Sequence, residues 1–216
     1  MLEKLELHDV VTALLHGTLL IGATVVLFPK LLDFIGMSDL PEGIPTLFFL
    51  FWAYFIGQVL VALSSFSQDL LYRTWGGKPS DHVFDGTFPE KYLPADSIKS
   101  AKCALQKRFG EHFSDRALFS VAMGIARKAE GSLSERHNQM YSYNRVCLTN
   151  LLIVSCLFAV SCFRGRCATL TGWEILVVAG GLLVLVFLHW YRAKQRAHYY
   201  VSEVVRVAER ELAGGE

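Results

Sequence analysis

The residues best suited to chemistry lie close together between Arg73 and Asp85. Arg73 and Lys78 carry the positive charge that binds phosphate, such as the phosphate of a lipid headgroup. His82, with Asp81 or Asp85 near it, has the residue types of a general acid or base. Arg73, Lys78, His82 and Asp85 are therefore candidates for a ligand or headgroup site. They support one hypothesis, a membrane-embedded enzyme that acts on a lipid or a lipid-linked substrate.

The same segment contains Gly76-Gly77-Lys78-Pro79-Ser80, which has some features of a nucleotide-binding phosphate loop. Such a loop needs an earlier glycine at a fixed spacing and a lysine followed directly by Ser or Thr. Pro79 interrupts that order, so the segment predicts a tight turn instead. A metal site needs three or four ligands, and no second cluster completes Asp81, His82 and Asp85. We therefore expect neither a metal nor another cofactor.

The cysteines give no further sign of catalysis. Cys147, Cys156 and Cys162 fall in one apolar segment, where a buried and inert thiol is expected. Cys162 and Cys167 are close enough in sequence to form one disulfide on an oxidising side of the membrane. No cysteine has a convincing His partner for nucleophilic catalysis, so the sequence favours a protein that is not an enzyme.

Two polar residues are expected at membrane depth, His16 and Gln58. Ionisable groups at this depth are costly and often functional. One hypothesis places His16 and Gln58 on an inner surface of a bundle. The alternative is an interhelical hydrogen bond from His16, with Thr12, Thr18 or Gln58 as the partner.

Helices that cross a membrane must position these residues. Of the 216 residues, 52% are hydrophobic and 19% are charged, whereas a soluble domain carries about 25% charged residues. The deficit is concentrated in four stretches near the length of about 20 residues that crosses a bilayer. The predicted spans are residues 10–28, 46–66, 146–163 and 175–191. The predicted fold class is all-α, a four-helix transmembrane bundle with helical cytoplasmic extensions and a cytoplasmic insertion between the second and third spans.

Lys and Arg near the span ends set the orientation. They are more numerous on the side of both termini and the middle segment, which predicts a cell inner membrane protein with cytoplasmic N- and C-termini. Four regions follow from this topology. They are a transmembrane hairpin at 1–66, a cytoplasmic loop and helical region at 67–134, a second transmembrane hairpin with a cytoplasmic extension at 135–191, and a cytoplasmic helical stem and tail at 192–216.

Two helices are predicted within the 67–134 region. Asp96 or Ser97 begins the first helix, which ends at Gly110, and Ser114 begins the second, which ends at Gly131. The predicted buried face of the first consists of Ile98, Ala101, Leu105 and Phe109. That of the second consists of Leu118, Val121, Ala122 and Ile125.

An apolar stripe follows the fourth span at a spacing close to a heptad repeat. It consists of Ala197, Val201, Val204, Ala208 and Leu212. A stem of this kind cannot bury its stripe alone, so it pairs either with residues 135–145 of the same chain or with copies of itself. Ala197, Val201, Val204 and Ala208 are therefore candidates for an oligomer seam.

The predicted spans contain no Asp, Glu, Lys or Arg, which argues against a proton-coupled pump or another secondary transporter. Small residues that suit close helix packing occur in the first and fourth spans. They are Gly17, Gly22, Ala23, Ala179, Gly180 and Gly181. The net charge of +1 gives no sign of a nucleic-acid partner.

Three segments carry a resemblance to a known class. They are WGGKPS after the second span, MYSYNRVCLTNLL entering the third, and HWYRAKQRAHYYVSEVVRVAERE leaving the fourth. In layout the chain resembles the small multi-pass membrane effectors of prokaryotic anti-phage and conflict systems. The resemblance implies cytoplasmic helices that sense a signal or a partner, and a role in antiviral defense. It implies no functional residues.

The favoured functional hypothesis is a non-enzymatic membrane protein that forms a homo-oligomer. It couples a small-molecule signal or a cytosolic protein partner to the lipid bilayer, by opening a pore or by disturbing the membrane. The first alternative is the lipid-directed enzyme described above. The second is a membrane anchor for a cytosolic partner.

Overall fold

The computed structural model of the chain describes residues 2–28, 43–110, 112–129, 131–165 and 170–214. Over these residues the backbone forms eight helices and no strand, which confirms the all-α prediction. The helices are α1 (Leu2–Leu27), α3 (Ile44–Phe66), α4 (Gln68–Trp75), α5 (Pro79–His82), α6 (Ala95–Phe109), α7 (Asp115–Lys128), α8 (Ser134–Phe163) and α9 (Gly172–Ala213).

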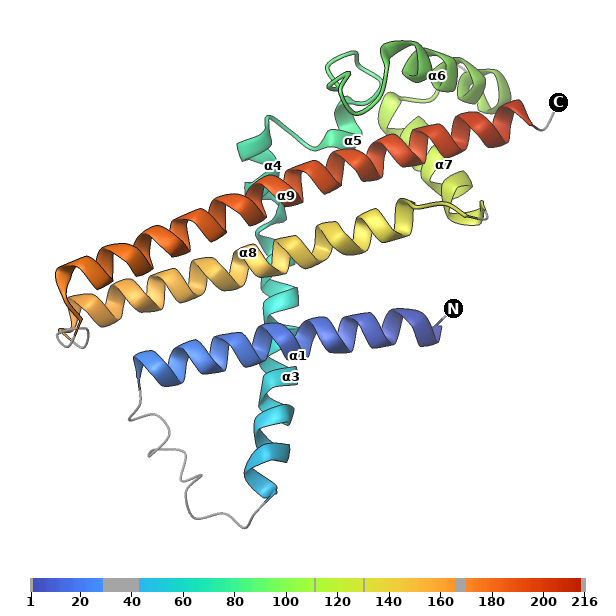
Figure 1. The fold of residues 1–216 in the computed structure, drawn as a ribbon. Coiled ribbons are helices and arrows are strands. Elements are labelled where there is room, and N and C mark those ends of the chain that lie inside the picture. The colour runs from blue at the N-terminus through green and yellow to red at the C-terminus, as the bar shows by residue number, and fades with distance from the viewer. Residues whose placement is uncertain (1, 29–42, 111, 130, 166–169, 215–216) are drawn as a thin grey trace. The chain divides into compact units, whose positions relative to one another are not determined.

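Four of these helices are long and apolar enough to cross a membrane (Figure 1). They contain the candidate spans Asp9–Leu27, Ile44–Phe66, Ser134–Phe163 and Gly172–Ala213. The set matches the four predicted spans and is compatible with an integral membrane protein. A helix rises about 1.5 Å per residue, so α9 extends over about 63 Å, roughly twice the thickness of a hydrocarbon core. Its 42 residues therefore exceed what one crossing needs.

The surfaces of the apolar helices suit contact with lipid. Phe51 on α3 is 63% exposed, and Leu183 and Phe187 on α9 are 70% and 60% exposed. Large apolar side chains exposed side by side are rare on soluble monomers and mark membrane or partner contact. Their exposure supports the assignment of α3 and α9 as spans.

The chain divides into two compact units. Unit 1 comprises Met1–Gln68 and Tyr143–Trp190, and unit 2 comprises Asp69–Ser142 and Tyr191–Ala213 together with the end of the chain. Unit 1 contains α1 and α3, with the apolar parts of α8 and α9. Unit 2 contains α4, α5, α6 and α7, with the remaining parts of α8 and α9.

In unit 1, α1 crosses α3 (Figure 1). Gly17 faces the backbone of Ala53, and Gly57 faces the backbone of Ala13, so closely that a Cβ on either glycine would overlap a carbonyl oxygen. The two pairs have the same four-residue spacing on both helices. Small residues at this spacing allow membrane helices to approach closely and to gain dispersion contacts between their backbones.

In unit 2, the C-terminal half of α9 packs against α6, α7 and the segment before α6. The buried core draws side chains from each of these elements, among them Leu93, Leu105, Leu118, Val204 and Ala208. The His198 ring stacks on the Tyr92 ring, with 4.7 Å between their centroids. Arg206 Nη2 donates a hydrogen bond of 3.1 Å to the Tyr92 carbonyl oxygen. Apolar and polar contacts together tie the segment before α6 to α9.

The two helices predicted in the 67–134 region are present as α6 and α7. Ser114 caps α7, because its Oγ accepts a hydrogen bond of 3.3 Å from the backbone N–H of Ala117. Gly110, at φ +111°, ends α6 as predicted. The predicted face of α6 is buried at Ile98, Ala101 and Leu105. Its fourth member, Phe109, is 40% exposed, so its predicted burial was wrong because the helix ends there.

We predict that Gly17→Val separates α1 from α3 by forcing a side chain against the Ala53 backbone. The free energy of unfolding of the full chain in bicelles should fall by about 1–3 kcal/mol, as expected for overpacking of a close contact. Gly22→Val is the matched control, because a Cβ at Gly22 meets nothing within 4 Å. If both substitutions lowered the free energy of unfolding equally, the close contact between α1 and α3 at Gly17 would be contradicted.

Candidate functional site

The glycine pair that follows α4 ends that helix. Gly76 has φ +88° and Gly77 has φ +128°. The Gly77 N–H donates to the Tyr72 carbonyl oxygen at 2.9 Å, and the Gly76 N–H donates to the Arg73 carbonyl oxygen at 3.3 Å. This pair of hydrogen bonds is the Schellman C-cap, which needs a left-handed residue that glycine adopts without strain. The segment is a turn, as the sequence predicted.

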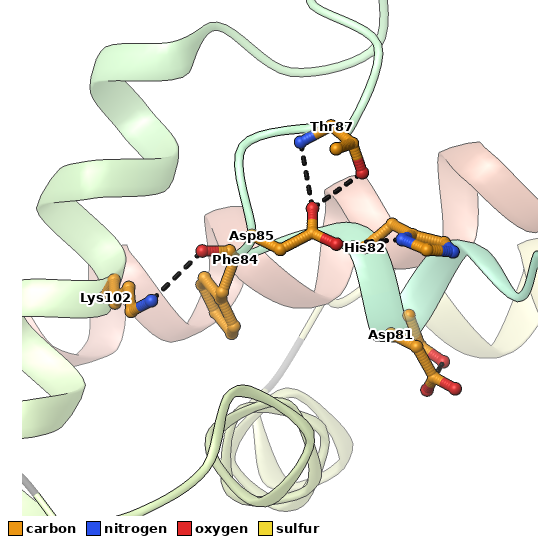
Figure 2. Close-up of polar contacts among 7 residues, drawn as sticks. Asp81, His82, Phe84, Asp85, Thr87 and Lys102 are labelled. Atoms are coloured by element: carbon orange, nitrogen blue, oxygen red, sulfur yellow. Dashed lines mark hydrogen bonds and ion pairs between the residues drawn. The ribbon is translucent and has the colours of Figure 1, made fainter.

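The chain next brings His82 and Asp85 together, as Figure 2 shows. His82 Nδ1 lies 2.8 Å from Asp85 Oδ2. Asp85 Oδ1 accepts two hydrogen bonds from Thr87, of 2.9 Å from the backbone N–H and 2.6 Å from Oγ1. The His82 ring lies so close to Gly77 that a Cβ there would overlap Nε2. The imidazole and the carboxylate are therefore held by their own loop.

The Asp85 carboxylate is kept in its ionised form. Desolvation acts to raise the pKa of Asp85, but the hydrogen bonds from Thr87 and the contact with His82 together lower that pKa below its usual value. Because an ionised carboxylate only accepts hydrogen bonds, His82 carries its proton on Nδ1. The carboxylate thus fixes the orientation of the imidazole.

The other residues predicted for this site do not join the pair. Arg73 is exposed in the last turn of α4, and Lys78 is exposed at the start of α5. Among the described residues, neither donates a hydrogen bond to His82 or Asp85. Asp81 points away from the pair (Figure 2) and accepts a hydrogen bond of 3.3 Å from Ser80 Oγ.

The His82–Asp85 pair lies at the surface of unit 2. A general base needs a free nitrogen within hydrogen-bond reach of a substrate. Here Nδ1 of His82 faces Asp85, and Nε2 lies beside Gly77, while the His82 side chain is 40% exposed. Across the parts of the chain that the structure describes, no group of three or more His, Cys, Asp or Glu could hold a metal ion.

His16 lies in a second polar cluster, between α1 and α8 in unit 1. Its side chain is fully buried. Nδ1 lies 2.6 Å from the Thr12 carbonyl oxygen, and Nε2 lies 3.0 Å from Cys147 Sγ. Since a carbonyl can only accept, Nδ1 carries the proton and Nε2 accepts a hydrogen bond from the thiol. His16 thus makes an interhelical hydrogen bond, and its partner across the helices is Cys147, which the sequence analysis had not named for it. Gln58 does not hydrogen-bond to His16.

Asn150 extends the His16 cluster by one turn of α8. Its Nδ2 donates a hydrogen bond of 3.0 Å to the His16 carbonyl oxygen, and the residue is 4% exposed. The Tyr143 ring meets the His16 ring edge-on, with 5.2 Å between centroids. Sequence reasoning missed Asn150 and Tyr143. The available signal was the Asn itself, the only one in the predicted third span.

A third polar cluster connects the end of α3 to α8. Arg145 is buried, and its Nη1 and Nη2 donate to Gln68 Oε1 at 2.5 Å and to Ser65 Oγ at 3.2 Å. Ser67 Oγ and Thr149 Oγ1 lie 3.4 Å apart in the same region. These contacts lie where the uncharged part of α8 begins, at the predicted boundary of the third span.

The candidate oligomer seam is buried inside the chain itself. Val201, Val204 and Ala208 belong to the core of unit 2, with exposed fractions of 3% or less. Ala197 packs with Tyr141 in a smaller cluster. The stripe is therefore covered by the chain's own α6, α7 and α8. These contacts are all made within one chain.

The possible bridge between Cys162 and Cys167 involves a residue outside the described ones, Cys167. Of the three cysteines expected to be buried, Cys147 is buried and Cys162 is partly buried, but Cys156 is exposed, so its expected burial was wrong. Cys103 is exposed.

No protein family, curated protein or solved structure matches this chain. The likeness of layout to anti-phage membrane effectors therefore stays a hypothesis. The function has to be argued from the contacts, burial and helix lengths described above.

We predict that His16 and Cys147 stabilise the membrane unit cooperatively. In a double-mutant cycle with His16→Leu and Cys147→Ala, the coupling energy should be about 0.6 kcal/mol and at most about 1.7 kcal/mol, the range for interhelical hydrogen bonds in membranes. The measurement is the free energy of unfolding in bicelles. The matched cycle pairs His16→Leu with Cys156→Ala, an exposed cysteine of the same helix, and should be additive. Coupling energies of the same size in both cycles would contradict the hydrogen bond between His16 and Cys147.

Proposed function

We propose that this chain is a non-enzymatic integral membrane protein that couples a signal received by unit 2 to its transmembrane helices. The signal is a small molecule or a cytosolic protein, because unit 2 is the cytoplasmic part in the predicted topology. The protein acts as a homo-oligomer in the cell inner membrane, with both termini cytoplasmic. Its output is a change in the bilayer, either an opened pore or a local disturbance, as in the anti-phage effectors that it resembles in layout.

The observation that carries this proposal is the continuity of α8 and α9. Both helices contribute to both units, and α9 contains neither Pro nor Gly between Gly181 and Ala213. Helices bend sharply almost only at Pro, at Gly or Ser pairs, or at π-bulges. No such bend site separates the part of α9 in unit 2 from its apolar part. A rotation or shift of α9 in unit 2 should therefore also move the apolar part of the helix.

Contacts between α8 and α9 on both sides of the division support the same coupling. In unit 1, His189 Nδ1 lies 3.1 Å from Asn144 Oδ1. In unit 2, the Tyr141 side chain packs with Ala193 and Ala197. α8 and α9 thus contact each other near the end of the uncharged segment of α9, and we expect the two helices to move as a pair.

The interface of the proposed oligomer lies on the apolar part of α9 in this account. None of the residues in its most apolar window is buried within the chain. A Cβ added at Gly180 or Gly181 would meet nothing within 4 Å, so this small-residue surface is open to a helix from another copy. Close approach at such residues is a common basis of helix association in membranes.

The enzyme alternative is not adopted, because Arg73 and Lys78, its expected phosphate ligands, do not join the His82–Asp85 pair. The anchor alternative differs in what it needs. An anchor holds a stoichiometric protein partner and requires no second copy of itself, so subunit composition separates the two functions.

We predict that the full chain forms one closed oligomer in native mass spectrometry from mild detergent. Gly180→Leu should shift that species to the monomer, since a leucine there would hold the α9 surfaces apart. Gly22→Leu is the matched control, because Gly22 is an equally open glycine in α1. A wild-type monomer bound to one protein partner would contradict the proposed oligomer and favour the anchor function.

A further inference from the structure

The His198 ring is enclosed in unit 2 between α9 and residues 83–94, the segment before α6. It stacks on the Tyr92 ring, with 4.7 Å between their centroids, and its centroid lies 5.5 Å from that of the Phe88 ring. His198 is only 6% exposed. Phe88 and Tyr92 belong to the same buried core as the C-terminal half of α9. The imidazole therefore lies at the surface where the segment packs on α9.

The hydrogen bond of His198 determines where a second proton would be added. Nδ1 lies 2.8 Å from the Lys194 carbonyl oxygen. Because a carbonyl can only accept, Nδ1 carries the proton of the neutral ring, and a further proton would be added at Nε2. Among the described residues, none forms a hydrogen bond with Nε2. A proton at Nε2 would therefore gain no acceptor from the protein.

The charges around this ring are positive. Within the described parts of the chain, Lys194 of α9 and Lys91 of the 83–94 segment are the charged groups that act on His198. Lys91 Nζ lies 4.9 Å from the centroid of the Tyr92 ring, on which the imidazole stacks. Arg206 of α9 also reaches this surface, where its Nη2 donates to the Tyr92 carbonyl oxygen. Burial and the neighbouring cations therefore both oppose a charged imidazole.

We propose that His198 is a pH-sensitive switch that holds residues 83–94 on α9 while its ring is neutral and loosens them when its ring is protonated. A histidine in water takes up its proton at about pH 6.5. The detached state therefore binds a proton that the packed state resists, so detachment becomes more favourable as the pH falls below this value. The proposal goes beyond the function proposed above, because it needs unit 2 to fold but needs neither the oligomer nor the coupling.

The size of the effect follows from the uptake of one proton. If the packed ring stays neutral and the detached ring titrates at about pH 6.5, lowering the pH from about 7.5 to about 5.5 favours detachment about tenfold. Amide hydrogen exchange of the full chain in nanodiscs measures this change, with each rate divided by that of an unstructured amide at the same pH. The Tyr92 N–H donates to the Pro89 carbonyl oxygen at 3.0 Å in the packed segment, and its protection should fall about tenfold.

Three variants assign the change to one histidine. His198→Phe keeps an aromatic ring in the stack but cannot take up a proton, so protection should be the same at both pH values. His112→Phe is the matched control, because His112 is an exposed histidine of unit 2, and it should retain the tenfold change. His137→Phe should also retain it, although the His137 ring stacks on Tyr199 nearby. Retention of the change in His198→Phe, or its loss in either of the other variants, would overturn the proposal.

A measurement on the unchanged chain remains decisive if His198→Phe fails to fold, which lost protection of the α7 amides around Leu118 would reveal. Exchange of the imidazole C2 hydrogen, followed by mass spectrometry, reports the titration of each histidine. The midpoint of His198 should lie at least about one pH unit below that of exposed His112. Coincident midpoints, or equal protection of the wild-type Tyr92 amide at both pH values, would overturn the switch. A failed oligomer in mass spectrometry would leave these results unchanged, so the two proposals fail separately.

Discussion

The physical constraint behind this structure is that a hydrocarbon layer offers no hydrogen bonds to the backbone. Every N–H and C=O within it must be paired inside the chain, which leaves α-helices as the solution for a protein of this composition. The same constraint governs the few polar side chains at that depth. His16 is paired at both ring nitrogens, with Thr12 and Cys147, and Asn150 bonds the His16 backbone. Where hydrophobic association is absent, close backbone contact at Gly17 and Gly57 packs the first two spans.

Helices that are longer than the bilayer requires build the rest of the molecule. The excess of α9 beyond its uncharged segment supplies Val201, Val204 and Ala208 to a core that also contains α6 and α7. The excess of α8 supplies Tyr141. Unit 2 therefore has no separate linker to the membrane helices at these two connections. Its folding and its attachment use the same residues of α8 and α9, and the proposed coupling is based on this continuity.

Features governed by local sequence could be predicted, and long-range pairings could not. Composition located the four spans, and turn chemistry located the α7 cap at Ser114 and the turn at Gly76 and Gly77. Periodicity showed that the stripe through Val204 must be buried, but it could not show what covers it, because one sequence does not separate intrachain from intersubunit contact. The Cys147 partner of His16 lies 131 residues away in the chain, and no local pattern records such a distance. Phe109 was placed on a buried face from periodicity alone, although the predicted helix end at Gly110 directly follows it.

Labelling with a membrane-impermeant maleimide tests the central claim, four spans with unit 2 on the cytoplasmic side, most directly. The full chain would keep exposed Cys103 of unit 2 as its single cysteine, and a second chain would carry Leu183→Cys, in the apolar part of α9, instead. The account predicts that Cys103 is labelled in inverted vesicles and protected in intact cells, and that the cysteine at 183 is protected in both. Labelling of Cys103 in intact cells would reverse the orientation. Labelling at 183 as fast as at Cys103 would place α9 in water and contradict the account.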